Sequence, residues 1–213
     1  MRKARRINTI LNNHGLLLEA CLELPDLPGR YPGVVLCHPD PRYGGSMDNN
    51  IIMAVSQELT QVGIAGLSFN FRGVGRSQGS FGGGIPEQSD ARAALDFLSR
   101  HEEINPARIG IMGYSFGGRV ALPVGSTDNI VKAIAGVSPV IPAGALRVCT
   151  KPKLIICGAE DDVIPASNVL REAEDMPQPK IIEVLPGIDH FWWGGEEELA
   201  GIVAGFFADS LAG

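Results

Sequence analysis

The chain has 213 residues, of which 45% are hydrophobic and 20% charged, and its formal net charge is −6. This length predicts one domain, residues 1–213, whose core forms without disulfides or metals. The acidic balance argues against nucleic acid or an anionic membrane as the main partner, and the lack of any run of about 18 apolar residues argues against a transmembrane helix.

A basic cluster occupies residues 2–6, where Arg2, Lys3, Arg5 and Arg6 fall within five positions. Because chain ends are commonly solvated, we interpret this cluster as an exposed tail. The stretch that follows, residues 7–14, is too polar for the apolar region of a secretory signal. We therefore expect a cytoplasmic protein.

Apolar runs separated by turn residues predict regular alternation of strands and helices. In chain order we expect strands at 7–12, 16–24 and 34–37, a helix at 47–62, a strand at 64–69, a glycine-rich loop at 73–84, a helix from Ser89 or Asp90 to 101, a strand at 108–113, a helix at 115–124, strands at 131–137 and 153–157, a helix at 166–175, a strand at 180–185 and a helix at 196–211. This order is typical of an α/β fold with a doubly wound, mainly parallel sheet and helices on both faces. Active sites in such sheets lie at the carboxyl ends of the strands.

Four cysteines, Cys21, Cys37, Cys149 and Cys157, contain no CxxC pair. Three of them lie in the apolar runs that we expect to be strands. Buried, reduced thiols are therefore the expected state, rather than a disulfide framework or a zinc site.

The strand at 108–113 leads directly into a G-x-S-x-G sequence, residues 113–117. In a strand–turn–helix context this pattern indicates a nucleophile elbow, with Ser115 held on a sharp turn. The glycines two residues before and after the serine let strand and helix approach closely. The backbone N–H of Phe116 would then face the oxyanion that develops during attack.

A serine nucleophile needs a base, commonly a histidine oriented by a carboxylate. In elbow-type hydrolases these residues follow the serine in the order carboxylate, then histidine. His190 is the only histidine after Ser115, and it follows the strand at 180–185. Residues 129–159 contain no Asp or Glu, so the candidates for the acid are Glu160, Asp161 and Asp162.

With these residues in place, the chain resembles the α/β-hydrolase superfamily, and most of all its compact, lidless branch related to dienelactone hydrolases. The motifs that carry the resemblance are HPDP (38–41) with GGSM (44–47), NFRGVGRS (70–77), GYSFG (113–117) and GAEDDVIP (158–165). Dienelactone hydrolases themselves use a cysteine nucleophile, whereas this elbow holds serine. The resemblance therefore implies the fold and the triad rather than the dienelactone reaction.

The resemblance also implies roles for two further residues. The family's pattern of Gly, two residues, Asp, two residues, Val or Ile, then Pro falls on Asp161 as the acid. A second oxyanion donor is expected in the loop after the strand at 34–37. Because prolines at 39 and 41 have no N–H, we assign this donor to Asp40. His38, in the same loop, is expected to brace the loop rather than act as a base.

Three other segments bear on the site. The glycine loop at 73–79 lacks the signature of a phosphate-binding loop, so we expect it to border the site structurally. The aromatic run Phe191-Trp192-Trp193 fits an acyl pocket or a subunit interface, and it fits core packing at least as well as either, because most large aromatic side chains are buried. The segment 138–152 is too short for a cap domain and should leave the site open.

Together these features predict a serine hydrolase that cleaves a small carboxylic ester or thioester through an acyl-enzyme. Neither a metal nor an organic cofactor is required. Two alternatives stay open: a peptidase or acyltransferase on the same triad, or a catalytically silent binding protein of the same fold. Reaction with a fluorophosphonate probe distinguishes an active triad from a silent one. The sequence leaves the substrate and the oligomeric state undetermined.

Overall fold

A computed structural model describes residues 4–212, in which eight strands form one sheet. The strand order is β1-β2-β4-β3-β5-β6-β7-β8, and β4, β3 and β5 to β8 run parallel to one another. The elements are β1 (Ala4–Asn13), β2 (Leu16–Pro25), β3 (Tyr31–Cys37), the short 3-10 helix η1 (Pro41–Tyr43), α1 (Asn50–Gln61), β4 (Ala65–Phe69), α2 (Glu87–Arg100), β5 (Ile104–Tyr114), α3 (Phe116–Thr127), β6 (Val131–Val137), β7 (Lys153–Gly158), α4 (Ala166–Glu174), β8 (Lys180–Leu185) and α5 (Glu196–Ser210). This is the doubly wound, mainly parallel sheet that the sequence predicted.

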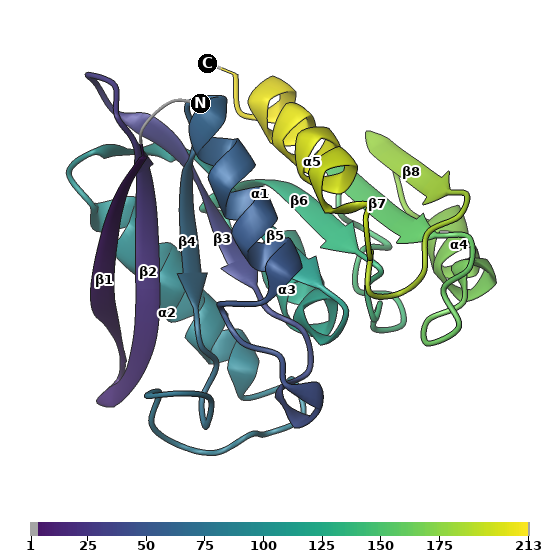
Figure 1. The fold of residues 1–213 in the computed structure, drawn as a ribbon, viewed down its shortest axis with the longest axis horizontal. Helices are drawn as coiled ribbons and strands as arrows, with labels where there is room; N and C mark the ends of the chain where they lie inside the picture. The colour runs from purple at the N-terminus through teal and green to yellow at the C-terminus, as the bar shows by residue number, and fades with distance from the viewer. Residues whose placement is uncertain (1–3, 213) are drawn as a thin grey trace.

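Helices cover both faces of the sheet and enclose two separate hydrophobic cores. In Figure 1, α1 and α5 lie in front of the sheet, while α2, α3 and α4 lie behind it. Continuous apolar runs such as Val34–Cys37 are buried on both faces because each face packs against helices. All four cysteines are free and buried within these strands and loops, and burial raises the pKa of the Cys157 thiol to about 11.

The N-terminal hairpin corrects the interpretation of the basic cluster. Arg2 and Lys3 lie outside the described residues. Arg5 and Arg6, however, are part of β1, where they pair with residues of β2, and Arg5 forms an ion pair with Glu103. They are strand rather than tail because β2 continues to Pro25 and offers backbone partners along the whole of β1.

Two helices start at other residues than predicted, and in both cases a side chain near the start accepts hydrogen bonds from backbone N–H groups. The side chain of Asn49 accepts from the N–H groups of Ile51 and Ile52, so α1 starts at Asn50 rather than at 47. Helix α2 starts at Glu87, before the predicted Ser89 or Asp90. The buried Glu87 carboxylate there accepts from two loop N–H groups, those of Gly82 and Gly84.

The carboxyl ends of the parallel strands carry loops but no cap. Residues 138–152, between β6 and β7, contain only turns, centred on 143–148. The edge is therefore open, as the length of this segment predicted.

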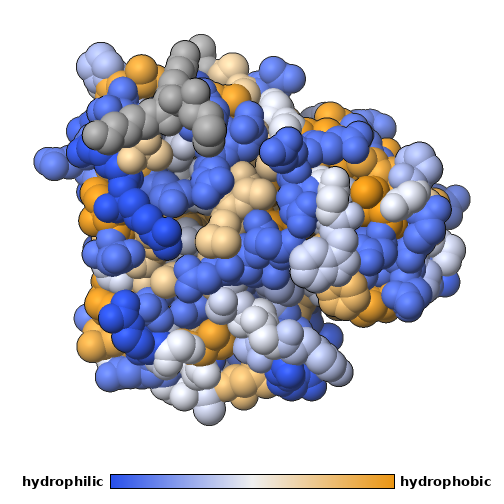
Figure 2. All heavy atoms as spheres, in the orientation of Figure 1, coloured by the Kyte–Doolittle hydropathy of each residue, from blue (hydrophilic) through white to orange (hydrophobic). Residues whose placement is uncertain are grey.

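The surface is uneven in hydropathy. Figure 2 shows hydrophobic residues at the edge formed by β8, where Ile181 and Val184 are exposed. Much of the front face over α1 and α5 is hydrophilic. Within residues 4–212, none of the helices combines the length and the apolar character needed to cross a membrane.

Candidate active site

The turn between β5 and α3 consists of Ser115 alone. Its backbone has φ +53° and ψ −115°, in the positive-φ region that non-glycine residues rarely adopt. A Cβ atom on Gly113 would lie 2.2 Å from the Gly117 carbonyl oxygen, and one on Gly117 would lie 2.0 Å from the Cys37 carbonyl oxygen. Neither position has room for a side chain, which explains the two glycines of the elbow.

The hydroxyl of Ser115 lies in a hydrogen-bonded row with His190 and Asp161. His190 Nε2 lies 3.0 Å from Ser115 Oγ, and His190 Nδ1 lies 2.8 Å from Asp161 Oδ2. Because a carboxylate only accepts, Nδ1 carries the hydrogen and Nε2 is left to accept from the serine hydroxyl. This is the arrangement that general-base activation of a serine requires.

Of the three consecutive carboxylates after β7, only Asp161 reaches this row. Asp161 is only 4% exposed, whereas Glu160 and Asp162 are both exposed to solvent. Asp161 Oδ1 accepts from the N–H groups of Val163, at 3.1 Å, and Ile164, at 2.7 Å. The loop after β7 therefore turns around the carboxylate and fixes its orientation.

Burial acts to raise the pKa of the Asp161 carboxyl, but hydrogen bonds from His190 and from the Ile164 N–H outweigh it, so this pKa lies below its ordinary value. The ionised carboxylate can hold the Nδ1–H tautomer of His190 and stabilise an imidazolium.

Tyr114 supports His190 from the other side, since its hydroxyl donates to the His190 carbonyl at 2.8 Å. Burial raises the pKa of Tyr114, so the hydroxyl keeps its proton. Sequence reasoning missed this residue, because the residue before the elbow serine has no required identity.

The two predicted oxyanion donors, Asp40 and Phe116, both line the cavity at Ser115. Phe116 is the first residue of α3, and Asp40 precedes η1. The Asp40 carboxylate is engaged with Arg42, accepting from its backbone N–H at 2.9 Å and pairing with its guanidinium at 2.6 Å. Within residues 4–212, no carbonyl accepts from the backbone N–H of either Asp40 or Phe116. The direction of these N–H groups toward an oxyanion stays a prediction.

His38 lies in the same loop but outside the row. It is fully buried, its Nδ1 donates to the Pro39 carbonyl at 2.7 Å, and its Nε2 accepts from the Phe71 N–H at 3.1 Å. Burial lowers the pKa of His38 to about 4. The predicted bracing contacts are present, and both ring nitrogens are occupied by backbone groups.

The aromatic run after His190 divides into three environments. Phe191 is half exposed and lines the cavity, with its ring edge-on to the His190 ring at 5.5 Å between centroids. Trp192 is buried in the core, and its indole N–H donates to Ser138 Oγ at 3.1 Å. Trp193 is 72% exposed. Core packing is therefore correct for Trp192, and lining of the site is correct for Phe191.

The cavity above Ser115 has a volume of about 590 Å³ and includes side chains that sequence reasoning did not single out. Tyr43, Arg119 and Val140 line it, together with Val163 and Ile164 of the loop after β7. Arg119 could have been found, because it lies in the first turn of α3, directly after the elbow. Val140 and Ile164 come from loops whose approach depends on the sheet.

Among residues 4–212, no group of three or more His, Cys, Asp or Glu side chains is arranged to hold a metal ion.

Comparison with known proteins shows which family the chain belongs to. The dienelactone hydrolase family matches residues 86–197, which include the elbow, Asp161 and His190 and make up more than half of the chain. The chain belongs to the dienelactone hydrolase family. It is 31% identical over 180 residues to an uncharacterized protein of Rickettsia prowazekii, covering 79% of this chain and 75% of that one.

Two further proteins are similar to this chain over most of its length. The chain is 29% identical over 188 residues to an uncharacterized protein of Mycobacterium tuberculosis, and the match covers 76% of this chain but only 64% of that relative. A lidless α/β serine hydrolase from Xanthomonas campestris superposes with a TM-score of 0.85 at 26% identity, covering 98% of this chain and 96% of that one. The family and the fold together identify a hydrolase with the α/β-hydrolase fold and no lid.

Proposed function

We propose that this hydrolase cleaves a small carboxylic ester or thioester, with Ser115 as nucleophile, His190 as base and Asp161 as the carboxylate that orients it. The observation that carries the proposal is the row from Ser115 Oγ through His190 to Asp161, with donor–acceptor distances of 3.0 and 2.8 Å. The residues are buried, yet Ser115 opens onto the cavity.

In the first half-reaction, Ser115 Oγ forms a bond to the acyl carbon while its proton passes to His190 Nε2. The tetrahedral oxyanion accepts hydrogen bonds from the N–H groups of Phe116 and Asp40. The bond to the leaving oxygen or sulfur then breaks, and the proton on Nε2 passes to that atom. An acyl ester of Ser115 remains.

In the second half-reaction, water attacks the acyl carbon and gives its proton to His190 Nε2. The bond to Ser115 Oγ breaks, and Oγ recovers the proton. Throughout, Asp161 holds the Nδ1–H of His190 and stabilises the imidazolium that forms twice per cycle. No step needs a redox partner or a cofactor.

The test is hydrolysis of p-nitrophenyl acetate by the purified chain, compared with Ser115→Ala and with the control Ser167→Ala. Ser167 is exposed on α4 and lines none of the cavity around Ser115. Ser115→Ala should lower turnover by about 10³ to 10⁶, as in other triads, while the control stays near wild type. Equal activity in all three proteins would overturn the proposal.

Two further measurements address the intermediate and the alternatives. Mass spectrometry of the acid-quenched reaction should find an acyl group on Ser115, and a burst of p-nitrophenol should precede the steady state if deacylation is slower. A fluorophosphonate probe should label Ser115, whereas a silent binding protein would stay unlabelled. The cytoplasmic location and the single domain over residues 1–213 stay predictions.

A further inference from the structure

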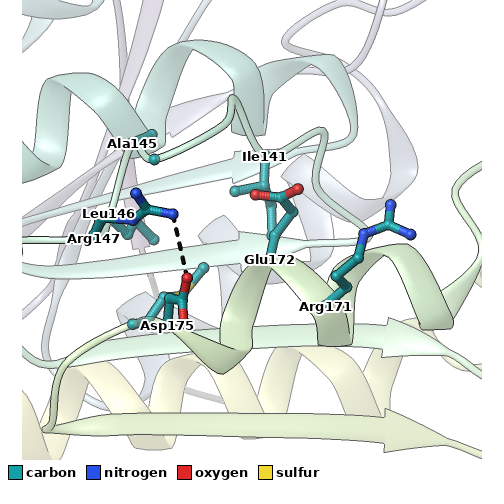
Figure 3. A pocket seen from close by; sticks show the side chains of 9 residues that line it. Ile141, Ala145, Leu146, Arg147, Arg171, Glu172 and Asp175 are labelled. Atoms are coloured by element: carbon teal, nitrogen blue, oxygen red, sulfur yellow. Dashed lines mark hydrogen bonds and ion pairs between the residues drawn. The ribbon is translucent and has the colours of Figure 1, made fainter.

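The cavity at Ser115 continues as a groove along α4. Val140, Val163 and Ile164 line both this cavity and a second hollow of about 270 Å³. Ile141, Arg171 and Glu172, in turn, line both the second hollow and a third of about 230 Å³, which is the one drawn in Figure 3. The three hollows are therefore neighbours, and together they are here called the α4 groove, between the 138–152 segment and α4.

The near end of the α4 groove is held against the nucleophile. The N–H of Val140 donates to the carbonyl oxygen of Ser115 at 3.0 Å, so the groove begins beside the elbow. The α4 groove is open to solvent because residues 138–152 form turns and irregular backbone but no cap helix.

The chemistry of the reaction decides which part of a substrate points into the groove. A tetrahedral intermediate has four substituents: Ser115 Oγ, the oxyanion, the leaving group and the rest of the acyl group. In the proposed mechanism the oxyanion faces Phe116 and Asp40, and the leaving atom lies within reach of His190 Nε2 to receive its proton. Val140 forms another wall of the cavity beside Ser115, and the groove starts there.

The lining of the α4 groove changes along its length. Next to Ser115 it is apolar, with Val140, Val163 and Ile164, and Ile141 continues this stretch. At the far end it is charged: in Figure 3, Glu172 points toward Ile141.

Beyond Glu172, Arg147 pairs with Asp175 at 3.2 Å across the third hollow. Helix α4 has nine residues, which corresponds to about 13 Å of helix. The apolar stretch alongside it therefore suits a chain of limited length.

We propose that the α4 groove binds an unbranched, medium-length apolar acyl group, such as hexanoyl or octanoyl, during acylation and deacylation. The proposal rests on the proposed function and names the substrate class of that same site. Apolar contact with the near half of the groove favours each added methylene. A longer chain must displace water from the charged groups at the far end, which is unfavourable.

The experiment measures kcat/KM for p-nitrophenyl acetate, butyrate, octanoate and dodecanoate below their solubility limits, each divided by its rate of hydrolysis by hydroxide. The wild type should prefer octanoate to acetate by at least about tenfold and should be slower on dodecanoate than on octanoate. A flat series, or a steady rise through dodecanoate, would overturn the groove proposal.

A matched pair of variants tests whether the preference for octanoate arises in the α4 groove. Asn168 lines the second hollow, whereas its neighbour Ser167 on α4 lines none of the three, and both residues are exposed. Asn168→Trp should fill the groove and remove most of the preference for octanoate, whereas Ser167→Trp should keep the wild-type ratio. Identical ratios in the two variants would contradict the proposal.

A third variant tests the far end by a gain of activity. Glu172→Leu removes the charge that points toward Ile141, so the ratio of dodecanoate to octanoate should rise several-fold. An unchanged ratio would contradict the assigned length limit. The two proposals fail differently: absence of hydrolysis of every ester in the series overturns the proposed function, whereas hydrolysis without chain-length preference overturns the groove alone.

Discussion

Two loops at the same edge of the sheet each hold a buried histidine, and the two histidines differ in their partners. His38 follows β3 and His190 lies beyond β8; both are at most 5% exposed. In each ring Nδ1 donates to an oxygen and Nε2 accepts from a donor, so both are in the same neutral tautomer.

The difference lies in what Nε2 accepts from. At His38 the donor is the backbone N–H of Phe71, which does not give up its proton, and the acceptor at Nδ1 is a neutral carbonyl. At His190 the donor is the hydroxyl of Ser115, which can transfer its proton, and the acceptor is a carboxylate that stabilises the charged ring. Burial and tautomer alone therefore do not make a base; an exchangeable proton and a counter-charge do.

The largest expected effect separates the two histidines directly. His190→Ala should lower kcat on p-nitrophenyl acetate by about a millionfold, because the base and the acid of both half-reactions are lost. His38→Ala should cost far less, since both ring nitrogens of His38 are hydrogen-bonded to backbone groups rather than to Ser115. Steady-state kinetics of both variants, with circular dichroism to confirm folding, test this ranking. The reverse order would move the base to the loop after β3.

The second-largest expected effect comes from removing the negative charge of Asp161 beside His190. Asp161→Asn should lower turnover by about 10⁴, because an amide can donate to Nδ1 and favour the wrong tautomer of His190. Asp162→Asn, one residue away and exposed, should stay near wild type on the same ester. If Asp162→Asn were the inactive variant, the acid would be misplaced by one residue.

A smaller effect concerns His38 and acid stability. The pKa of His38 falls from the ordinary 6.5 to about 4 in the folded chain because of burial. Between pH 6.5 and about 4, the imidazole of His38 is protonated in the unfolded chain but not in the folded chain. About 3 kcal/mol of the free energy of unfolding is therefore lost as the pH falls through this range.

Urea unfolding between these pH values measures the loss. His38→Gln, which cannot titrate, should have a correspondingly shallower dependence on pH. An equal slope in both proteins would show that His38 is protonated in the folded state.

The smallest effect concerns support of His190 through its backbone. Tyr114→Phe removes the hydrogen bond to the His190 carbonyl, which is worth about 1 kcal/mol. We expect about a fivefold loss in kcat, a similar KM and an unchanged overall fold. A loss as large as that of Asp161→Asn would mean that Tyr114 acts on the reacting atoms.

Much of the fold follows from local patterns in the sequence. The order of strands and helices, the doubly wound sheet and the missing cap all match the prediction, because apolar runs and glycine turns report burial and connection length directly. The predicted ends of elements were less accurate, as at α1 and α2. Capping by Asn49 and the loop contacts of Glu87 depend on where side chains find backbone partners.

Within the candidate site, the sequence by itself determined what short-range geometry demands. The two elbow glycines were predictable because backbone approach leaves no room for a Cβ atom. His190 was the sole downstream histidine, and Asp161 fits a fixed spacing after a strand. The catalytic roles of these residues stay predictions, although their contacts agree with them.

Only the tertiary structure decided the features that depend on segments far apart in the chain. The parallel register of β5, β7 and β8 brings Ser115 within 3.0 Å of His190, which lies 75 residues later. Pairing with β2 makes Arg5 and Arg6 part of a strand, and packing buries Trp192 while Trp193 stays exposed. The α4 groove likewise exists only because two loops and a helix meet. The spacing of residues within a short segment does not predict such contacts, because they depend on which elements become neighbours once the sheet has formed.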